Sequence, residues 1–220
     1  GKQLDRMRYE ALVRKNPLMD FDKLLFIKRY TFQSSHFYTD FIDGCVRFGG
    51  NLRILDLETG EATDLVPEMG DGIFGRFDLH FSATKIVFDW KASPREGFRI
   101  YEVDIDPETG RRTGGPRQLT YPPDDEAARI AKYAHPNQTS GPGSYYHQTD
   151  DMHPCYLPDG GIVFTSTRCE YGTLCDAADI LSTAVLYRMD GDGSHIEKLT
   201  NSSVSEFCPT MMADGRVLYT

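Results

Sequence analysis

Residues 151–164, DMHPCYLPDGGIVF, decide the fold, because two short runs of β-forming residues flank the turn sequence PDGG at 158–161. Proline, aspartate and glycine favour tight turns, whereas tyrosine, isoleucine, valine and phenylalanine favour strands, so the stretch predicts a β-hairpin. Its turn-and-strand half recurs as DKLLF at 22–26, TKIVF at 84–88 and GRVLY at 215–219. Such recurrence along a chain indicates a repeat architecture.

Further strands complete each repeat. Second strands with alternating apolar and polar residues follow at 52–57, 99–104 and 185–190, and third strands at 62–66, 117–120 and 197–200. An entry strand precedes the turn at 77–81, 153–157 and 208–212, which aligns Phe77, His153 and Cys208. Each unit is therefore a four-stranded antiparallel meander, as in a propeller blade. The sequence predicts an all-β fold, a β-propeller fragment of about three four-stranded antiparallel blades with a short N-terminal helix. An open stack or sandwich of meanders is the alternative.

The repeat also predicts how the chain is divided. Residues 1–17 are expected to be a lead-in helix and linker, because residues 5–15 have helical spacing and Pro17 ends the pattern. Residues 18–220 form the partial propeller, with blade units at about 18–70, 74–121 and 150–201 and the start of a further blade at 204–220. Polar insertions fall at 121–151 and 169–183. Both ends of the sequence are expected to be cuts in a longer protein.

Composition limits the partners. Hydrophobic residues make up 40% of the chain, which is a globular composition. The 24 basic and 33 acidic residues give a net charge of −9, which argues against nucleic acid and anionic membranes as partners. No apolar run approaches the roughly 18 residues of a membrane span. We therefore expect neither nucleic-acid binding nor a membrane span.

The cysteines and standard motifs exclude several kinds of site. The chain has five cysteines but no CxxC pair and no CxxCH motif, so it has no attachment site for a c-type haem. P-loop, GxSxG and HExxH motifs are also absent. Cys169 and Cys175 flank a short polar loop and are candidates for a disulfide if the compartment is oxidising. We expect no cofactor in this chain, apart from a possible metal ion.

Residues 145–155 hold the densest group of side chains that bind metals. His147, His153 and Cys155 lie in or next to this segment, and Cys208 aligns with His153 in the next unit. Equivalent positions of adjacent blades are neighbours around the channel, so these four residues are the candidate metal ligands. The alternative is that His153 and Cys155 only pack an inner strand. Arg168, at the end of a blade strand, is expected to pair with a carboxylate or a carbonyl.

Residues 151–160, 162–164 and 166–169 resemble TolB-like propeller repeats. More narrowly, these segments, together with residues 16–26, 49–57 and 73–79, are similar to the middle propeller domain of the hydrazine synthase alpha subunit family. The likeness spans about residues 15–220. It implies a large periplasmic or otherwise extracytoplasmic bacterial protein, in which this propeller sits among other domains, some carrying c-type haem. The resemblance assigns no catalytic residue to a position of this chain.

The resemblance leaves three functions open. The first is a scaffold with a docking and binding face, whose partners are flanking domains or other subunits. The second is part of a redox or metal-dependent enzyme site, or of a lyase or hydrolase acting on saccharides, on the propeller face. The third is a protein-interaction propeller of the TolB type. Because one fold hosts many functions, the resemblance alone does not choose among them.

Overall fold

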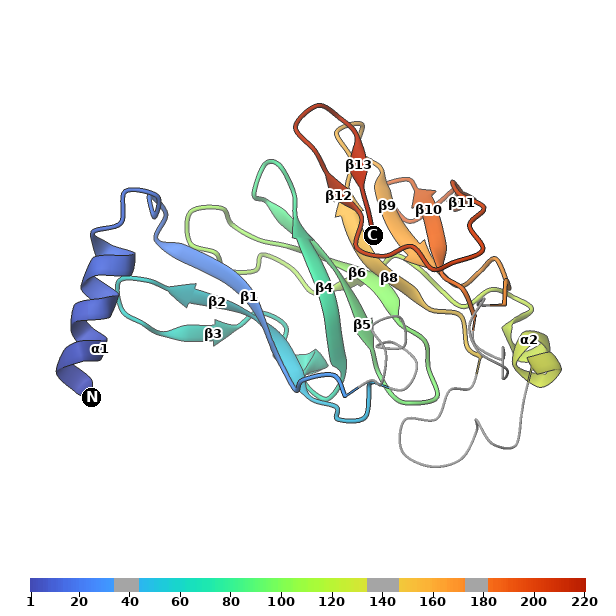
Figure 1. Cartoon of the computed structure of the whole chain (residues 1–220), viewed down its shortest axis with the longest axis horizontal. Helices are drawn as coiled ribbons and strands as arrows, with labels where there is room; N and C mark the ends of the chain where they lie inside the picture. The colour runs from blue at the N-terminus through green and yellow to red at the C-terminus, as the bar shows by residue number, and fades with distance from the viewer. Residues whose placement is uncertain (34–43, 134–146, 173–181) are drawn as a thin grey trace.

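The computed structural model describes residues 1–33, 44–133, 147–172 and 182–220, and its strands form four antiparallel sheets (Figure 1). The first sheet contains β1 (Lys23–Arg29), β2 (Gly50–Asp56) and β3 (Ala62–Asp64). The second contains β4 (Ile73–Leu79), β5 (Lys85–Lys91), β6 (Arg99–Asp104) and β7 (Arg117–Gln118). The third contains β8 (Asp151–Tyr156), β9 (Ile162–Ser166), β10 (Val185–Met189) and β11 (Glu197–Lys198). The fourth contains β12 (Thr210–Met211) and β13 (Val217–Leu218). The predicted all-β fold of antiparallel meanders is confirmed.

The sheets differ in how many strands they contain. The second and third are complete four-stranded meanders, in which each strand pairs with the next along the chain. The first sheet has three strands, and β1 corresponds by its turn to β5 and β9, each of which follows an entry strand in its own sheet. Within the described ranges no strand occupies the innermost position beside β1, where β4 and β8 lie in the next two sheets. In the part of the chain that the structure describes, the first blade therefore has three strands where the next two have four.

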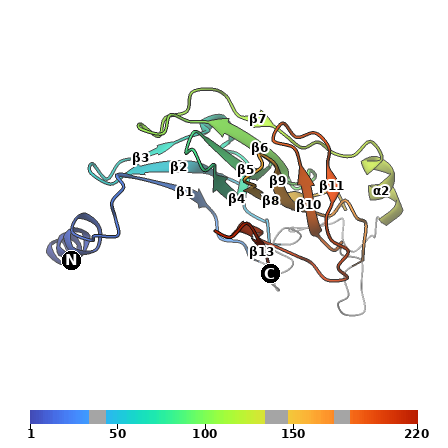
Figure 2. The ribbon, with the colours of Figure 1, turned by 90° about the horizontal axis from the view of Figure 1, so that it is seen from above.

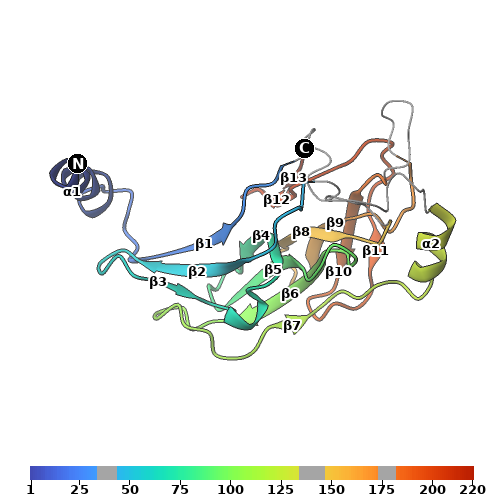
Figure 3. The same ribbon diagram turned by 90° about the horizontal axis from the view of Figure 1, so that it is seen from below.

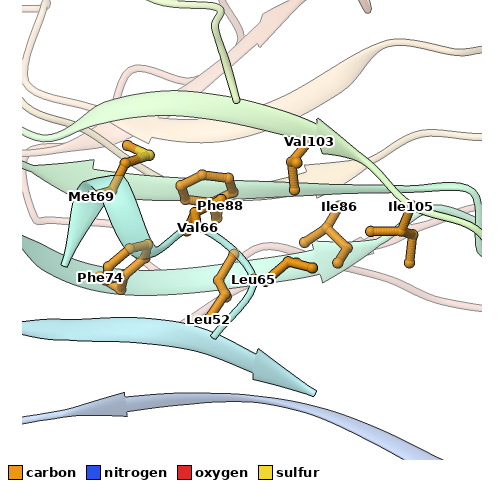
Figure 4. Close-up of a cluster of buried hydrophobic side chains, with 9 residues drawn as sticks. All are labelled: Leu52, Leu65, Val66, Met69, Phe74, Ile86, Phe88, Val103 and Ile105. Atoms are coloured by element: carbon orange, nitrogen blue, oxygen red, sulfur yellow. The ribbon is translucent and has the colours of Figure 1, made fainter. Parts of the chain in front are cut away.

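Alternating side chains of β5 explain why the sheets stack. Successive residues of a strand point to opposite faces. Ile86 and Phe88 join a buried cluster with residues of the first sheet, including Leu52, which Figure 4 shows between the two sheets. Val87, between them, belongs to a separate cluster with Tyr156 and other residues of the third sheet. The middle sheet is therefore buried on both faces, and each interface between sheets is a hydrophobic core.

Two helices lie at opposite ends of the molecule, as the views from above and below show (Figure 2 and Figure 3). The predicted N-terminal helix is α1 (Lys2–Tyr9), which continues as a π-helical segment (Glu10–Arg14) and stops before Pro17. The hydroxyl of Tyr9 donates to the carbonyl of Leu57, which ties α1 to the first sheet. The second helix, α2 (Glu126–Tyr133), lies in the first insertion and was not predicted.

A 3-10 turn (Pro67–Met69) connects the first sheet to the second. None of the helices in the described ranges has the length and apolar character needed to cross a membrane.

Candidate binding site at the inner-strand bulges

Two inner strands carry β-bulges, and these bulges place the candidate site. In β4 the pairing with β5 shifts between Phe74 and Phe77, and in β8 the pairing with β9 shifts between Met152 and Cys155. A bulge leaves one residue without a ladder partner and bends the strand, so the backbone next to it is free to bind elsewhere. Pro154, which has no N–H to give to a ladder, lies in the second bulge.

His153 and Cys208 share an unusual backbone. Their φ angles are 53° and 60°, in the left-handed region that residues with a side chain rarely adopt. The bulge position of His153 corresponds to Gly75 in β4, two residues before Phe77, with which the repeat pattern aligned it. That detail of the alignment was wrong, because a bulge leaves no mark in the apolar pattern.

The structure brings His153 and Cys208 together. The backbone N–H of Cys208 donates to Nδ1 of His153 at 3.3 Å, and the thiol sulfur lies 3.9 Å from the same nitrogen. Because Nδ1 accepts a hydrogen bond, the ring proton is on Nε2. Burial, together with the charges of Arg76 and Arg29, lowers the pKa of His153 to about 3, so the imidazole is neutral at pH 7.

The other two candidate ligands, Cys155 and His147, are also buried. Burial and the neighbouring carboxylate of Asp78 raise the pKa of Cys155 to about 12, so its thiol stays protonated. His147 is buried beside the ring of Tyr133, with 5.7 Å between ring centres, and burial lowers its pKa. Across the described residues, no three His, Cys, Asp or Glu side chains are grouped so that they could hold a metal ion. The metal site at these four residues stays a prediction.

The disulfide prediction is not decided either. The thiol of Cys169 lies 3.4 Å from the carbonyl oxygen of Thr183. Cys175 is outside the described residues. The pairing of Cys169 with Cys175 therefore stays a prediction.

Asp89, in the middle of β5, joins the two bulges. Its side chain is completely buried, and its two oxygens accept the backbone N–H groups of Arg76 and His153, each at 2.6 Å. One donor belongs to its own sheet and the other to the next, so a single carboxylate links two blades. Burial raises the pKa of Asp89 to about 6, and the hydrogen bonds from the backbone act in the opposite direction.

A second buried acid makes a similar link. Glu102 in β6 accepts hydrogen bonds from the hydroxyl of Tyr156 in β8, at 2.7 Å, and from Arg117, and it forms an ion pair with Lys85 at 3.1 Å. The backbone N–H of Tyr156 also donates to Asp78 of β4, at 2.8 Å. The interface between the second and third sheets is therefore held by side-chain acids as well as by its apolar core.

Arg168 behaves as predicted. Its Nε and Nη2 atoms donate to the two oxygens of the buried Asp151 at 2.9 and 2.7 Å, and Nη2 also donates to the carbonyl of Tyr121. The two-point geometry fixes the guanidinium at the N-terminal end of β8. The arginine therefore has a structural role.

Two adjoining cavities open beside the bulges. One, of about 450 Å³, runs along the inner strands β4, β8 and β12. The other, of about 300 Å³, lies deeper, against Asp89, and has walls of Phe32, Phe98, Met152 and Phe207. Gly75, Arg76 and His153 line both cavities. We call the deeper one the bulge cavity.

The charged side chains of the bulge cavity were missed by the sequence analysis. Arg76 is exposed, and within the described part of the chain its guanidinium has no ion-pair or hydrogen-bond partner. Arg29 also lines the cavity, with its guanidinium carbon 3.7 Å from the ring centre of Phe32. One signal was available for Asp89, which is a charged residue inside the apolar strand KIVFDWK at 85–91. The arginines have no such signal, because exposed arginines are common.

The comparisons with known proteins show the fold. No family model and no curated protein matches the chain. Among solved structures, hydrazine synthase of Kuenenia stuttgartiensis matches over 90% of this chain and 27% of that chain, at 16% identity and a TM-score of 0.57. TolB of Acinetobacter baumannii matches over 76% of this chain and 30% of that chain, at 19% identity and a TM-score of 0.44.

A puromycin-hydrolysing peptidase of Mycobacterium tuberculosis matches over 77% of this chain and 23% of that chain, at 12% identity and a TM-score of 0.49. The chain thus spans less than a third of each of these three structures. Together with the four antiparallel sheets, the match to hydrazine synthase identifies the chain as a β-propeller module.

Proposed function

We propose that this propeller module belongs to a multidomain extracytoplasmic bacterial protein resembling the hydrazine synthase alpha subunit, in which it is a scaffold and a docking face. The observation that carries the proposal is that two charged residues at the bulges have different roles. The buried Asp89 is fully used in joining two blades, whereas the guanidinium of Arg76 has no partner among the described residues and faces two cavities.

The scaffold part of the proposal is supported by the links between sheets. Asp89, Glu102 and Asp78 each connect the second sheet to the third through a hydrogen bond. Buried and charge-assisted hydrogen bonds are stronger than neutral exposed ones and fix geometry. Sheets joined in this way present their inner strands in a constant arrangement.

The docking part is supported by local charge. The chain as a whole carries a net charge of −9, but Arg29 and Arg76 make the bulge cavity locally cationic. A cationic patch on an acidic protein steers an acidic partner to that place. The partner that we propose is a flanking domain or another subunit of the parent protein, and the family resemblance points to a domain carrying c-type haem.

Photo-crosslinking in the full-length parent protein tests this proposal. A photoreactive phenylalanine at Phe81, which is 62% exposed and lines the larger cavity, should crosslink to another domain or subunit, as identified by mass spectrometry. Arg76→Glu should reduce the crosslink several-fold, because it reverses the charge of the face. Arg216→Glu, at an exposed ion pair on the β12–β13 turn, is the matched control and should have no effect. Crosslinks confined to this module would contradict a docking role.

A metal-dependent or redox site on the same face is the second candidate function. The approach of the Cys208 thiol to 3.9 Å from Nδ1 of His153 favours it, since thiolate and imidazole together bind zinc or copper. Further ligands would have to come from outside the described residues. Elemental analysis of the full-length protein should then find about one zinc or copper per chain, lost in His153→Ala. A metal content that is negligible in the wild type eliminates this candidate.

A further inference from the structure

The bulge cavity combines aromatic walls with guanidinium groups. Phe98 and Met152 are each 1% exposed, and the ring of Phe207 lies edge-on to His153 with 5.7 Å between centres. A volume of about 300 Å³ is at the small end of the range for ligand pockets, which are mostly apolar with a few placed polar groups. The cavity is therefore suited to a small ligand with a flat apolar body.

The charge of the cavity selects the polar end of that ligand. Two guanidiniums line it, and the Asp89 carboxylate is already engaged by two backbone N–H groups. His153 accepts a backbone N–H at Nδ1 and adds no negative charge. The field therefore favours an anion over a cation.

The guanidinium of Arg76 determines which kind of anion fits the cavity. Its planar fork of N–H donors matches both oxygens of a carboxylate, and it has no partner within the described ranges to displace. Arg29, stacked on Phe32, places a second positive charge at an aromatic wall. A carboxylate at Arg76 with its ring between the phenylalanines would satisfy both parts of the cavity.

From this arrangement we infer that the bulge cavity binds a small aromatic carboxylate, held at its charged end by Arg76. The inference goes beyond the proposed function, because it assigns a small ligand to a cavity on the proposed docking face. It assigns Arg76 as the residue that determines specificity for the anion, and the aromatic walls as the determinants for the ring.

Calorimetric titration of the full chain with phenylacetate tests the inference. We expect saturable binding with one site, and at least about tenfold weaker binding of acetate, which lacks the ring, and of 2-phenylethanol, which lacks the charge. Arg76→Gln should weaken phenylacetate binding by about tenfold or more, and Arg76→Lys by less, because lysine keeps the charge but loses the fork. Arg216→Gln should bind as the wild type does.

Three results would overturn the inference. These are no saturation by about 10 mM phenylacetate, equal binding by Arg76→Gln and wild type, and equal binding of phenylacetate and 2-phenylethanol. The crosslinking experiment separates this failure from failure of the docking role. If Arg76→Glu abolishes the crosslink but phenylacetate does not bind, only the ligand class is wrong. If phenylacetate binds but Phe81 crosslinks to no other domain or subunit, the docking role is wrong and the small-ligand site stands.

Discussion

Asp89 is one of three acids that connect the second and third blades. It is the acceptor for backbone N–H groups 13 and 64 positions away along the chain. An N–H group that is shielded from water and loses its acceptor destabilises the fold, because its desolvation is no longer offset by a hydrogen bond.

We therefore expect Asp89→Ala to lower the free energy of unfolding by about 3 kcal/mol, since two part-buried backbone N–H groups lose their acceptor and a buried side chain is truncated. Urea denaturation followed by circular dichroism measures the change. Asp214→Ala removes an acid from an exposed ion pair with Arg216 and should have little effect. Equal stability of the two variants would show that Asp89 does not hold the blades.

The lowered pKa of His153 makes the free energy of unfolding depend on pH. Its pKa in the folded protein is about 3, below the usual 6.5. Between these two values the imidazole is protonated in the unfolded chain but neutral in the folded chain. The contribution of neutral His153 to the free energy of unfolding is therefore fully present above pH 6.5 and is lost as the pH falls towards 3. His153→Asn removes the titration and tolerates a positive φ.

The stability advantage of the wild type over His153→Asn should thus shrink by about 1.4 kcal/mol per pH unit below pH 6.5. Urea titrations at pH 7 and at lower pH measure it. Asp89, whose raised pKa acts in the opposite direction, is present in both proteins. The control is His195→Asn, also at a positive φ of 53°, where a hydrogen bond to Asp190 raises the pKa and gives the opposite sign. A difference that is constant with pH would mean that the pKa of His153 is the same in the folded and unfolded states.

At the scale of the element, the β4 bulge depends on a glycine. A Cβ atom on Gly75 would lie 2.2 Å from Oδ1 of Asp89, the oxygen that binds the neighbouring N–H. Gly75→Ala should lower the free energy of unfolding by about 2 kcal/mol, by pushing that carboxylate away. Thermal denaturation compares it with Gly114→Ala, where a Cβ atom meets nothing within 4 Å. If both variants melt at the temperature of the wild type, the carboxylate of Asp89 does not pack tightly against Gly75.

The elements differ in how much the sequence could predict about them. Strands and turns were predictable, because alternation and turn residues are local signals. The helix α2 was missed although EAARIAK at 126–132 is rich in helix formers, because the insertion was interpreted only as polar loop. The approach of His153 to Cys208 followed from the repeat. The links made by Asp89 did not, since no local pattern connects residues 64 positions apart.

At the scale of the whole molecule, the edges of the sheets matter. Within the described ranges β1 pairs on one side only, and β13 pairs only with β12. Leu24 on β1 is 41% exposed and Leu218 on β13 is 58% exposed. Unpaired edges with apolar side chains recruit strands from other molecules.

The isolated chain should therefore self-associate as its concentration rises, as measured by sedimentation velocity. Replacing both edge leucines, Leu24→Lys with Leu218→Lys, should reduce the association, because charges on edges oppose strand pairing. Val204→Lys, at an exposed position outside the strands, is the control. A wild-type chain that stays monomeric at all concentrations would contradict this view of the edges.

The two-sided burial of β5 has a consequence for how the molecule melts. Ile86 and Phe88 complete one core and Val87 completes the other, so neither core survives without this strand. In an open array of repeats, units can unravel one at a time from the ends. Here, loss of either neighbouring sheet exposes one buried face of β5, so we expect the three large sheets to unfold as one cooperative unit.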